Sequence, residues 1–260
     1  MSKPIFILGS GRSGTSILTG ALKSGAGIEG YLEGHFLPLI LLLMKDMERY
    51  YYSKRELIGD ERHMITHIPQ EDIRSKILSA FKNTSESITK NEVWLDKSPD
   101  SGMIKAVPYL LEMWPDARFI FAKRRGIENI ISRLKKFPKV SFENHCLMWK
   151  DCMESWVITK KNLDNSLYIE VEQRQIALHP QKVAQEIGDF IGIKPEKVNR
   201  VAKIFTNQRP QSTGSVETQK ADDINEVGWT QEQIDCFRQH CGSINEKFGY
   251  SETSSYYLKK

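Results

Sequence analysis

A run of glycine and hydroxyl residues near the start of the chain has the composition of a phosphate-binding loop. A short apolar run leads into Gly-Ser-Gly-Arg-Ser-Gly-Thr-Ser at residues 9–16, and a helical pattern follows at once. In such a loop, successive backbone N–H groups and the helix N-terminus all face a bound anion. The spacing of glycines and serine is that of a P-loop, but Thr15 stands where nucleotide triphosphatases carry a lysine. Arg12 supplies the positive charge instead. The loop therefore predicts a phosphate site without the lysine that would hold a transferring γ-phosphate.

A second basic cluster predicts a second phosphate site. Lys-Arg-Arg at residues 123–125 follows the apolar run 117–122, and Ser132 lies eight residues after Arg124. A guanidinium and a hydroxyl together suit an isolated phosphate, and Lys136 shares the helix face of Ser132. The alternative is a solvent-exposed charge cluster at a strand end, which is common. Two separated phosphate sites would distinguish the ligand from ATP, whose phosphates are contiguous.

Three further residues have the chemistry to act beside a bound phosphate. Lys97 lies in Trp-Leu-Asp-Lys-Ser-Pro at residues 94–99, and Glu33 and His35 follow a short apolar segment. A fixed cation neutralises charge that develops on a leaving phosphate, and a base removes the proton of the attacking group. Glu33 and His35 are both candidates for that base. For Glu33 this predicts partial burial, which would raise its pKa toward the working pH.

The elements that must hold these residues alternate between strands and helices. Strand-like runs lie at residues 4–8, 28–32, 92–97, 117–122 and 167–171. Helical patterns lie between and after them, at about 15–24, 104–114, 127–136, 142–163, 180–191 and 230–247. This alternation predicts an α/β, P-loop-containing three-layer fold with a central, mostly parallel β-sheet flanked by helices. Ligands bind beyond the carboxyl ends of such strands, where all the residues singled out above would converge.

Length and composition are those of one globular domain. The 260 residues, 40% hydrophobic and 27% charged, predict a single domain over 1–260, with a helical insertion or lid at about 36–90. Aromatic residues there and just before it, such as Tyr31 and Phe36, are candidates for an acceptor wall or for core packing. The net charge of +4 without a long run of like charge favours a small anionic ligand over nucleic acid.

Cysteine and histidine usage predicts neither a disulfide framework nor a metal site. The four cysteines form no C-x-x-C pair and are expected to be free thiols, as in a reducing compartment. The histidines have no ligand spacing with cysteines or carboxylates. The most apolar stretch, residues 36–44, is far shorter than the roughly 20 residues of a membrane span. No signal peptide is visible, so we expect a cytoplasmic protein without a membrane span.

In order and register, these segments resemble the sulfotransferases that use 3′-phosphoadenosine 5′-phosphosulfate (PAPS), particularly the bacterial, carbohydrate and tyrosyl-type branches. The 5′-phosphosulfate loop of that family commonly reads Pro-Arg-Ser-Gly-Thr-Thr/Ser, and residues 11–16 stand in its place. The pair Arg124 and Ser132 has the spacing of its 3′-phosphate motif, and residues 94–99 match its Trp-x-Asp/Glu-Lys-x-Pro segment. One departure is that the tyrosine often found after the 167–171 strand is missing here.

The resemblance implies a PAPS-dependent sulfotransferase of the EC 2.8.2 type. Such an enzyme moves a sulfuryl group in line to a hydroxyl or amine acceptor and releases 3′-phosphoadenosine 5′-phosphate (PAP), without a metal. Arg12 and Lys97 would stabilise charge, and Glu33 falls in the register of the base in the tyrosyl-type branch, with His35 as the alternative. The implied contacts to the cofactor come from Gly11, Arg12, Ser13, Gly14, Thr15, Ser16, Arg124, Ser132 and Lys136. A small-molecule or carbohydrate acceptor is expected, and the sequence carries no signal for an oligomeric state.

Two other classes of function stay open at this point. A P-loop kinase or hydrolase using Mg-ATP would need the missing loop lysine and a magnesium-holding aspartate, for which Asp96 is the nearest approach. A non-catalytic nucleotide-binding relative would be expected to have lost the base or one of the two cations, and all are present. The polar loop at 212–215 and Lys220 either closes over the 3′-phosphate or is an ordinary polar loop.

Overall fold

Five parallel strands form the central sheet of the computed structural model, which describes residues 2–207 and 221–258. The strand order is β2-β3-β1-β4-β5, and the bounds are β1 Ile5–Gly9, β2 Gly30–Tyr31, β3 Leu95–Lys97, β4 Arg118–Lys123 and β5 Tyr168–Glu172. Every residue of β1 is buried, as expected for the central strand of a parallel sheet that is covered on both faces. The α/β fold with a parallel sheet, predicted from the alternation of segments, is confirmed.

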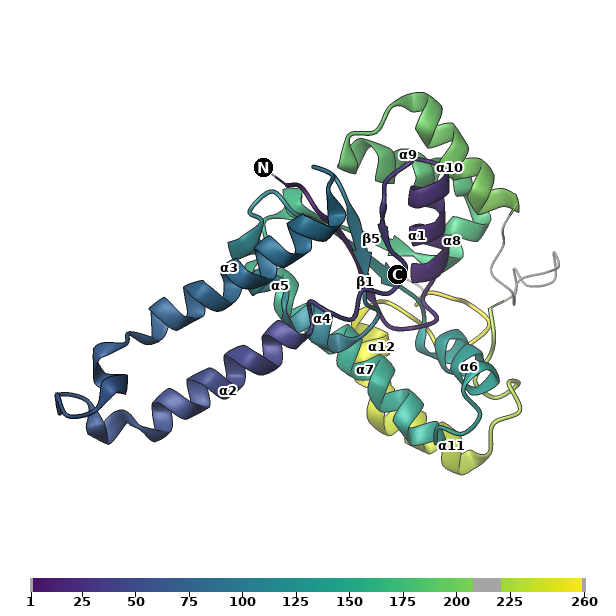
Figure 1. Cartoon of the computed structure of the whole chain (residues 1–260). Helices are drawn as coiled ribbons and strands as arrows, with labels where there is room; N and C mark the ends of the chain where they lie inside the picture. The colour runs from purple at the N-terminus through teal and green to yellow at the C-terminus, as the bar shows by residue number, and fades with distance from the viewer. Residues whose placement is uncertain (1, 208–220, 259–260) are drawn as a thin grey trace.

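Helices pack on both faces of the sheet (Figure 1). One face is covered by α1 Thr15–Ser24, α8 Gln173–Leu178, α9 Pro180–Ile191 and α10 Pro195–Asn207. The other face is covered by α4 Ser101–Lys105, α5 Val107–Met113, α6 Gly126–Lys136, α7 Phe142–Thr159, α11 Gln231–Phe237 and α12 Ser243–Lys247. The core of this second face is rich in aromatic rings, and Phe121 of β4 stacks on Trp156 of α7 with ring centroids 4.5 Å apart.

Residues 39–89 form a pair of helices that projects from the body of the molecule (Figure 1). Helix α2 spans Leu39–Ser53 and α3 spans Gln70–Thr89; short 3₁₀ turns at Arg55–Leu57 and Met64–His67 join them. The pair is fixed to the domain at its base, where Phe36 stacks on Phe81 of α3 with centroids 4.7 Å apart. The helical character predicted for 36–90 matches this arm, and its action as a lid stays a prediction.

Several elements differ from the sequence-based expectation. The helix predicted at 104–114 is two helices, because Pro108 cannot continue α4 and instead occupies the first turn of α5. The helix predicted at 230–247 is interrupted by a π-helical turn at Arg238–Gly242 between α11 and α12. Helices α8 and α10 were not expected, and the loop at 212–215 with Lys220 lies outside the described residues.

All four cysteines are free thiols. Cys146, Cys152 and Cys241 are buried, and Cys236 is half-buried. Over residues 2–207 and 221–258, no helix combines the length and apolar character needed to cross a bilayer, and no three metal-ligating side chains gather in one place.

Candidate active site

The glycine-rich loop turns tightly between β1 and α1 at the centre of the sheet. Gly9 has φ of 137°, and a Cβ there would overlap the carbonyl oxygen of Ala122 in the neighbouring strand β4. Only glycine therefore lets the chain leave β1 at this point. Among the described residues, no side chain caps the N-terminus of α1, whose N-cap residue is Gly14. The N–H groups of the first turn are thus available to an anion.

Two residues of the predicted 3′-phosphate site contact this loop directly. The Nη1 of Arg124 donates to the carbonyl oxygen of Arg12 at 3.0 Å. The Nε of Arg12 in turn donates to the Oγ of Ser132 on α6 at 3.0 Å. Hydrogen bonds therefore link the loop arginine, the strand-end arginine and the helix hydroxyl, so that the two predicted phosphate sites adjoin each other. Lys136 is not part of this network: it is solvent-exposed at the end of α6.

Two further residues of α6 contact the loop and were not identified from the sequence. Arg133 is 4% exposed, and its Nη1 lies 3.4 Å from the carbonyl oxygen of Gly11. The Nδ2 of Asn129 donates to that same oxygen and to the Oγ of Ser13, both at 3.0 Å. The available signal was the spacing from Asn129, which precedes Ser132 by three residues and Arg133 by four, because positions three and four apart share one helix face.

The site gathers three guanidinium groups, those of Arg12, Arg124 and Arg133, that form no ion pair within the described part of the chain. Burial lowers the pKa of Arg124 and Arg133, and the charge of Arg12 lowers both further. The Nε of Arg124 is also buried without a hydrogen-bond partner. A bound anion would relieve the repulsion and satisfy this donor.

Lys97 and Glu33 form an ion pair at the carboxyl end of β3. The Nζ of Lys97 donates to Glu33 Oε1 at 2.8 Å and lies 3.4 Å from the Oγ of Ser16 at the start of α1. Lys97 is 3% exposed, so its ammonium sits at the end of a buried side chain, between the loop and the carboxylate. His35 Nε2 lies 3.1 Å from the other oxygen of Glu33. Both candidate bases and the candidate cation therefore meet in one place.

The expectation that burial raises the pKa of Glu33 is wrong for this structure. The Glu33 side chain is half exposed, and the hydrogen bond from Lys97 is the main cause that lowers its pKa below the ordinary value. An adjacent ammonium favours the ionised carboxylate. Glu33 is therefore a weak base while Lys97 stays paired with it.

Comparison with known proteins places the chain in a family. Residues 4–197 match the sulfotransferase family, and the chain belongs to it. A protein-tyrosine sulfotransferase 2 of Gallus gallus is 24% identical over 197 residues, which cover 73% of this chain and 51% of that protein. The protein-tyrosine sulfotransferase of Drosophila melanogaster is 24% identical, with coverage of 73% and 38%. The chain thus spans about half the length, or less, of these curated relatives.

Solved structures share the fold. The sulfotransferase domain from the Synechococcus PCC 7002 olefin synthase superposes with a TM-score of 0.59 at 19% identity, covering 96% of each chain. The sulfotransferase STF9 from Mycobacterium avium gives a TM-score of 0.51 at 14% identity, covering 95% of this chain and 77% of that one. The resemblance drawn from the loop, the strand-end arginine and the Lys97 segment is confirmed at the level of family and fold.

Proposed function

We propose that the protein transfers a sulfuryl group from PAPS to a hydroxyl or amine acceptor. One observation carries the proposal: three guanidinium groups with no carboxylate partner among the described residues lie at the loop before α1, whose N-terminus no described side chain caps, and the same loop adjoins the pair of Lys97 and Glu33. The hydrogen-bond donors form two adjoining clusters, and each cluster suits one of the two anionic groups at the ends of a nucleoside. Membership of the sulfotransferase family supports the same donor.

The described residues fit the two anionic ends of PAPS. The backbone of residues 11–16 and the first turn of α1 would hold the 5′-phosphosulfate, as a helix N-terminus holds phosphate. Arg124 and Ser132 would hold the 3′-phosphate, and the unpartnered Nε of Arg124 supports this assignment. Arg133 and Asn129 hold the loop in shape from α6.

The reaction needs a base on one side of the sulfur and a cation on the other. The acceptor oxygen attacks the sulfur, and its proton passes to Glu33. The bond from sulfur to the bridging phosphate oxygen breaks, and its electron pair stays on that oxygen. Lys97 and Arg12 neutralise this growing charge, which a fixed cation in a partly dry site does effectively.

The contact between Lys97 and Glu33 links donor binding to the strength of the base. The Lys97 ammonium lies within reach of both Glu33 and Ser16 of α1. When it turns to a bound phosphosulfate, Glu33 loses the partner that lowers its pKa. The carboxylate then becomes a stronger base only after the donor has bound. A small-molecule or carbohydrate acceptor and a cytoplasmic location stay predictions from the sequence.

Calorimetric binding of PAP tests the donor site, with ATP measured with and without Mg²⁺ for comparison. We expect metal-independent binding of PAP that weakens by about tenfold to a hundredfold in Arg124→Ala, because a hydrogen-bonded charge is lost. Arg124→Lys keeps the charge in the buried position and tests the need for the guanidinium. Arg200→Ala, at an exposed position on α10, is the matched control. Preference for Mg-ATP, with Arg124→Ala indistinguishable from wild type, would contradict the proposal.

A further inference from the structure

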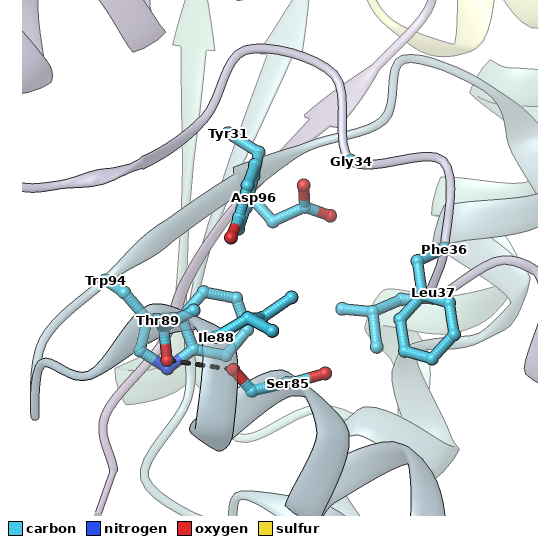
Figure 2. Close-up of a pocket in the computed structure, with 9 residues that line it drawn as sticks. All are labelled: Tyr31, Gly34, Phe36, Leu37, Ser85, Ile88, Thr89, Trp94 and Asp96. Carbon is cyan, nitrogen blue, oxygen red and sulfur yellow. Dashed lines mark hydrogen bonds between the residues drawn. The ribbon is translucent and has the colours of Figure 1, made fainter.

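A pocket lies on the opposite side of β3 from Lys97. Side chains alternate along a strand, so Lys97 points toward α1 while Asp96 points to the face covered by the arm. Figure 2 shows this pocket between the β2–β3 edge and the end of α3. It encloses about 370 Å³, part of it open to solvent. Its walls are mainly apolar, with Tyr31, Phe36, Leu37, Ile88 and Trp94 around the single carboxylate of Asp96.

The carboxylate of Asp96 is buried and lacks a well-formed hydrogen bond. Asp96 is 2% exposed, and neither of its oxygens has a partner at good hydrogen-bond geometry among the described residues, although the backbone of Lys97 and Gly34 and the hydroxyl of Ser98 lie near enough to stabilise its charge in part. In Figure 2 it lies between Tyr31 and the loop that carries Gly34. A side chain at Gly34 would overlap the carboxylate, so the loop leaves room for it. Burial raises the pKa of Asp96 to about 6, and the carboxylate is therefore mostly ionised at neutral pH.

A buried carboxylate without a donor is costly unless a ligand supplies one. The apolar walls exclude a ligand that is polar throughout, and the single negative charge favours one with a single cationic donor. We propose that this pocket binds the acceptor, and that the acceptor carries an apolar body with a protonated amine that pairs with Asp96. This inference rests on the proposed sulfotransferase function, and it names the class of acceptor.

The pocket adjoins the residues proposed to carry out the reaction. Gly34, in the pocket wall, lies between Glu33 and His35 in the chain, and its N–H donates to the carbonyl oxygen of Lys97 at 3.2 Å. The pocket wall and Glu33 thus belong to one short loop, and in this proposal the acceptor hydroxyl leaves the pocket beside that loop. Ile88 of α3 contributes one wall, which gives the projecting arm a role in holding the acceptor.

Two phenols that differ only in an amine test the inference directly. Tyramine carries a protonated amine, and 4-ethylphenol has the same ring and chain length without it. Calorimetry at pH 8 in the presence of PAP should show wild-type protein binding tyramine at least about tenfold more tightly, as expected for a buried charge-assisted hydrogen bond. Asp96→Asn should abolish this preference. Asp116→Asn removes an exposed carboxylate and should leave it unchanged.

A second variant separates the apolar wall from the charge. Ile88→Ala should weaken both phenols by a similar factor, about threefold to tenfold, and leave the preference for the amine intact. Equal binding of the two phenols by wild type, no binding of either, or a preference that survives in Asp96→Asn would overturn the inference. PAP binding is measured in every variant. Normal PAP binding together with any of those results leaves the sulfotransferase proposal standing, whereas loss of PAP binding in wild type contradicts that proposal instead.

Discussion

Replacing Asp96 by asparagine should change how the stability of the protein depends on pH. In the folded protein, burial raises the pKa of Asp96 from 3.8 to about 6, and the backbone and His35 offset only part of this. The folded state therefore holds a proton between pH 3.8 and about 6 that the unfolded chain has released. The contribution of Asp96 to the stability of the wild-type protein therefore falls as pH rises through this window. Asparagine has no proton to lose, so Asp96→Asn escapes the decline.

The magnitude follows from the two pKa values. The full difference corresponds to about 3 kcal/mol of unfolding free energy, lost by wild type above about pH 7. At pH 5 only about half of this loss has occurred, because the folded carboxyl is still mostly protonated. Between pH 5 and pH 8, Asp96→Asn should therefore gain about 1.4 kcal/mol over wild type.

Urea denaturation of the two proteins at pH 5, 6, 7 and 8 provides the measurement. Glu172, with a pKa raised by burial to about 7, titrates in the same range. It is common to both proteins, and its contribution cancels in the difference. Asp116→Asn, at an exposed position, is the control for the substitution itself. A flat difference for Asp96→Asn would refute the claim that Asp96 is buried without a donor.

Two further changes test the loop and the ion pair of Lys97 and Glu33. Lys97→Met should raise the pKa of Glu33 toward its ordinary value, because the lysine is the main cause that lowers it; carboxyl NMR titration of both proteins checks this, and an unchanged Glu33 contradicts the pairing. Gly9→Ala should destabilise the protein by more than about 2 kcal/mol, since the new Cβ overlaps the Ala122 carbonyl at a φ that alanine disfavours. Gly20→Ala, in open space on α1, should instead stabilise it by about 0.5–1 kcal/mol in the same denaturation assay.

The sheet could be predicted because its signals are local. Each strand is a short apolar run bounded by turn residues, and the alternation with helices defines the parallel arrangement. Helix boundaries were less certain where the interruption comes from one residue, as at Pro108 between α4 and α5. The π-helical turn at Arg238–Gly242 has no comparable signal, because it keeps the chain helical and changes only which groups bond.

The site could be predicted in its residue types but not in its contacts. Arg133 lies in the last turn of α6, where a basic side chain is expected to face solvent and the helix dipole. Its burial results from the packing of α6 against the loop, which the sequence of the helix alone does not reveal. The low pKa of Glu33 likewise depends on Lys97, a partner 64 residues away in the chain. Burial and partners are tertiary properties, whereas spacing is local.

The register of β3 places Lys97 and Asp96 on opposite faces of the sheet. Asp96 pairs in register with Phe6 of β1 on one side and Tyr31 of β2 on the other, so the strand is held from both edges. A slip by one residue would turn Lys97 into the apolar pocket and Asp96 toward the phosphate loop. Lys97 would then face the proposed acceptor and Asp96 the proposed phosphosulfate, so that each charge would meet the ligand proposed for the other. Pairing with β1 on one edge and β2 on the other therefore holds this three-residue strand in the register that puts its cation and its anion on opposite faces.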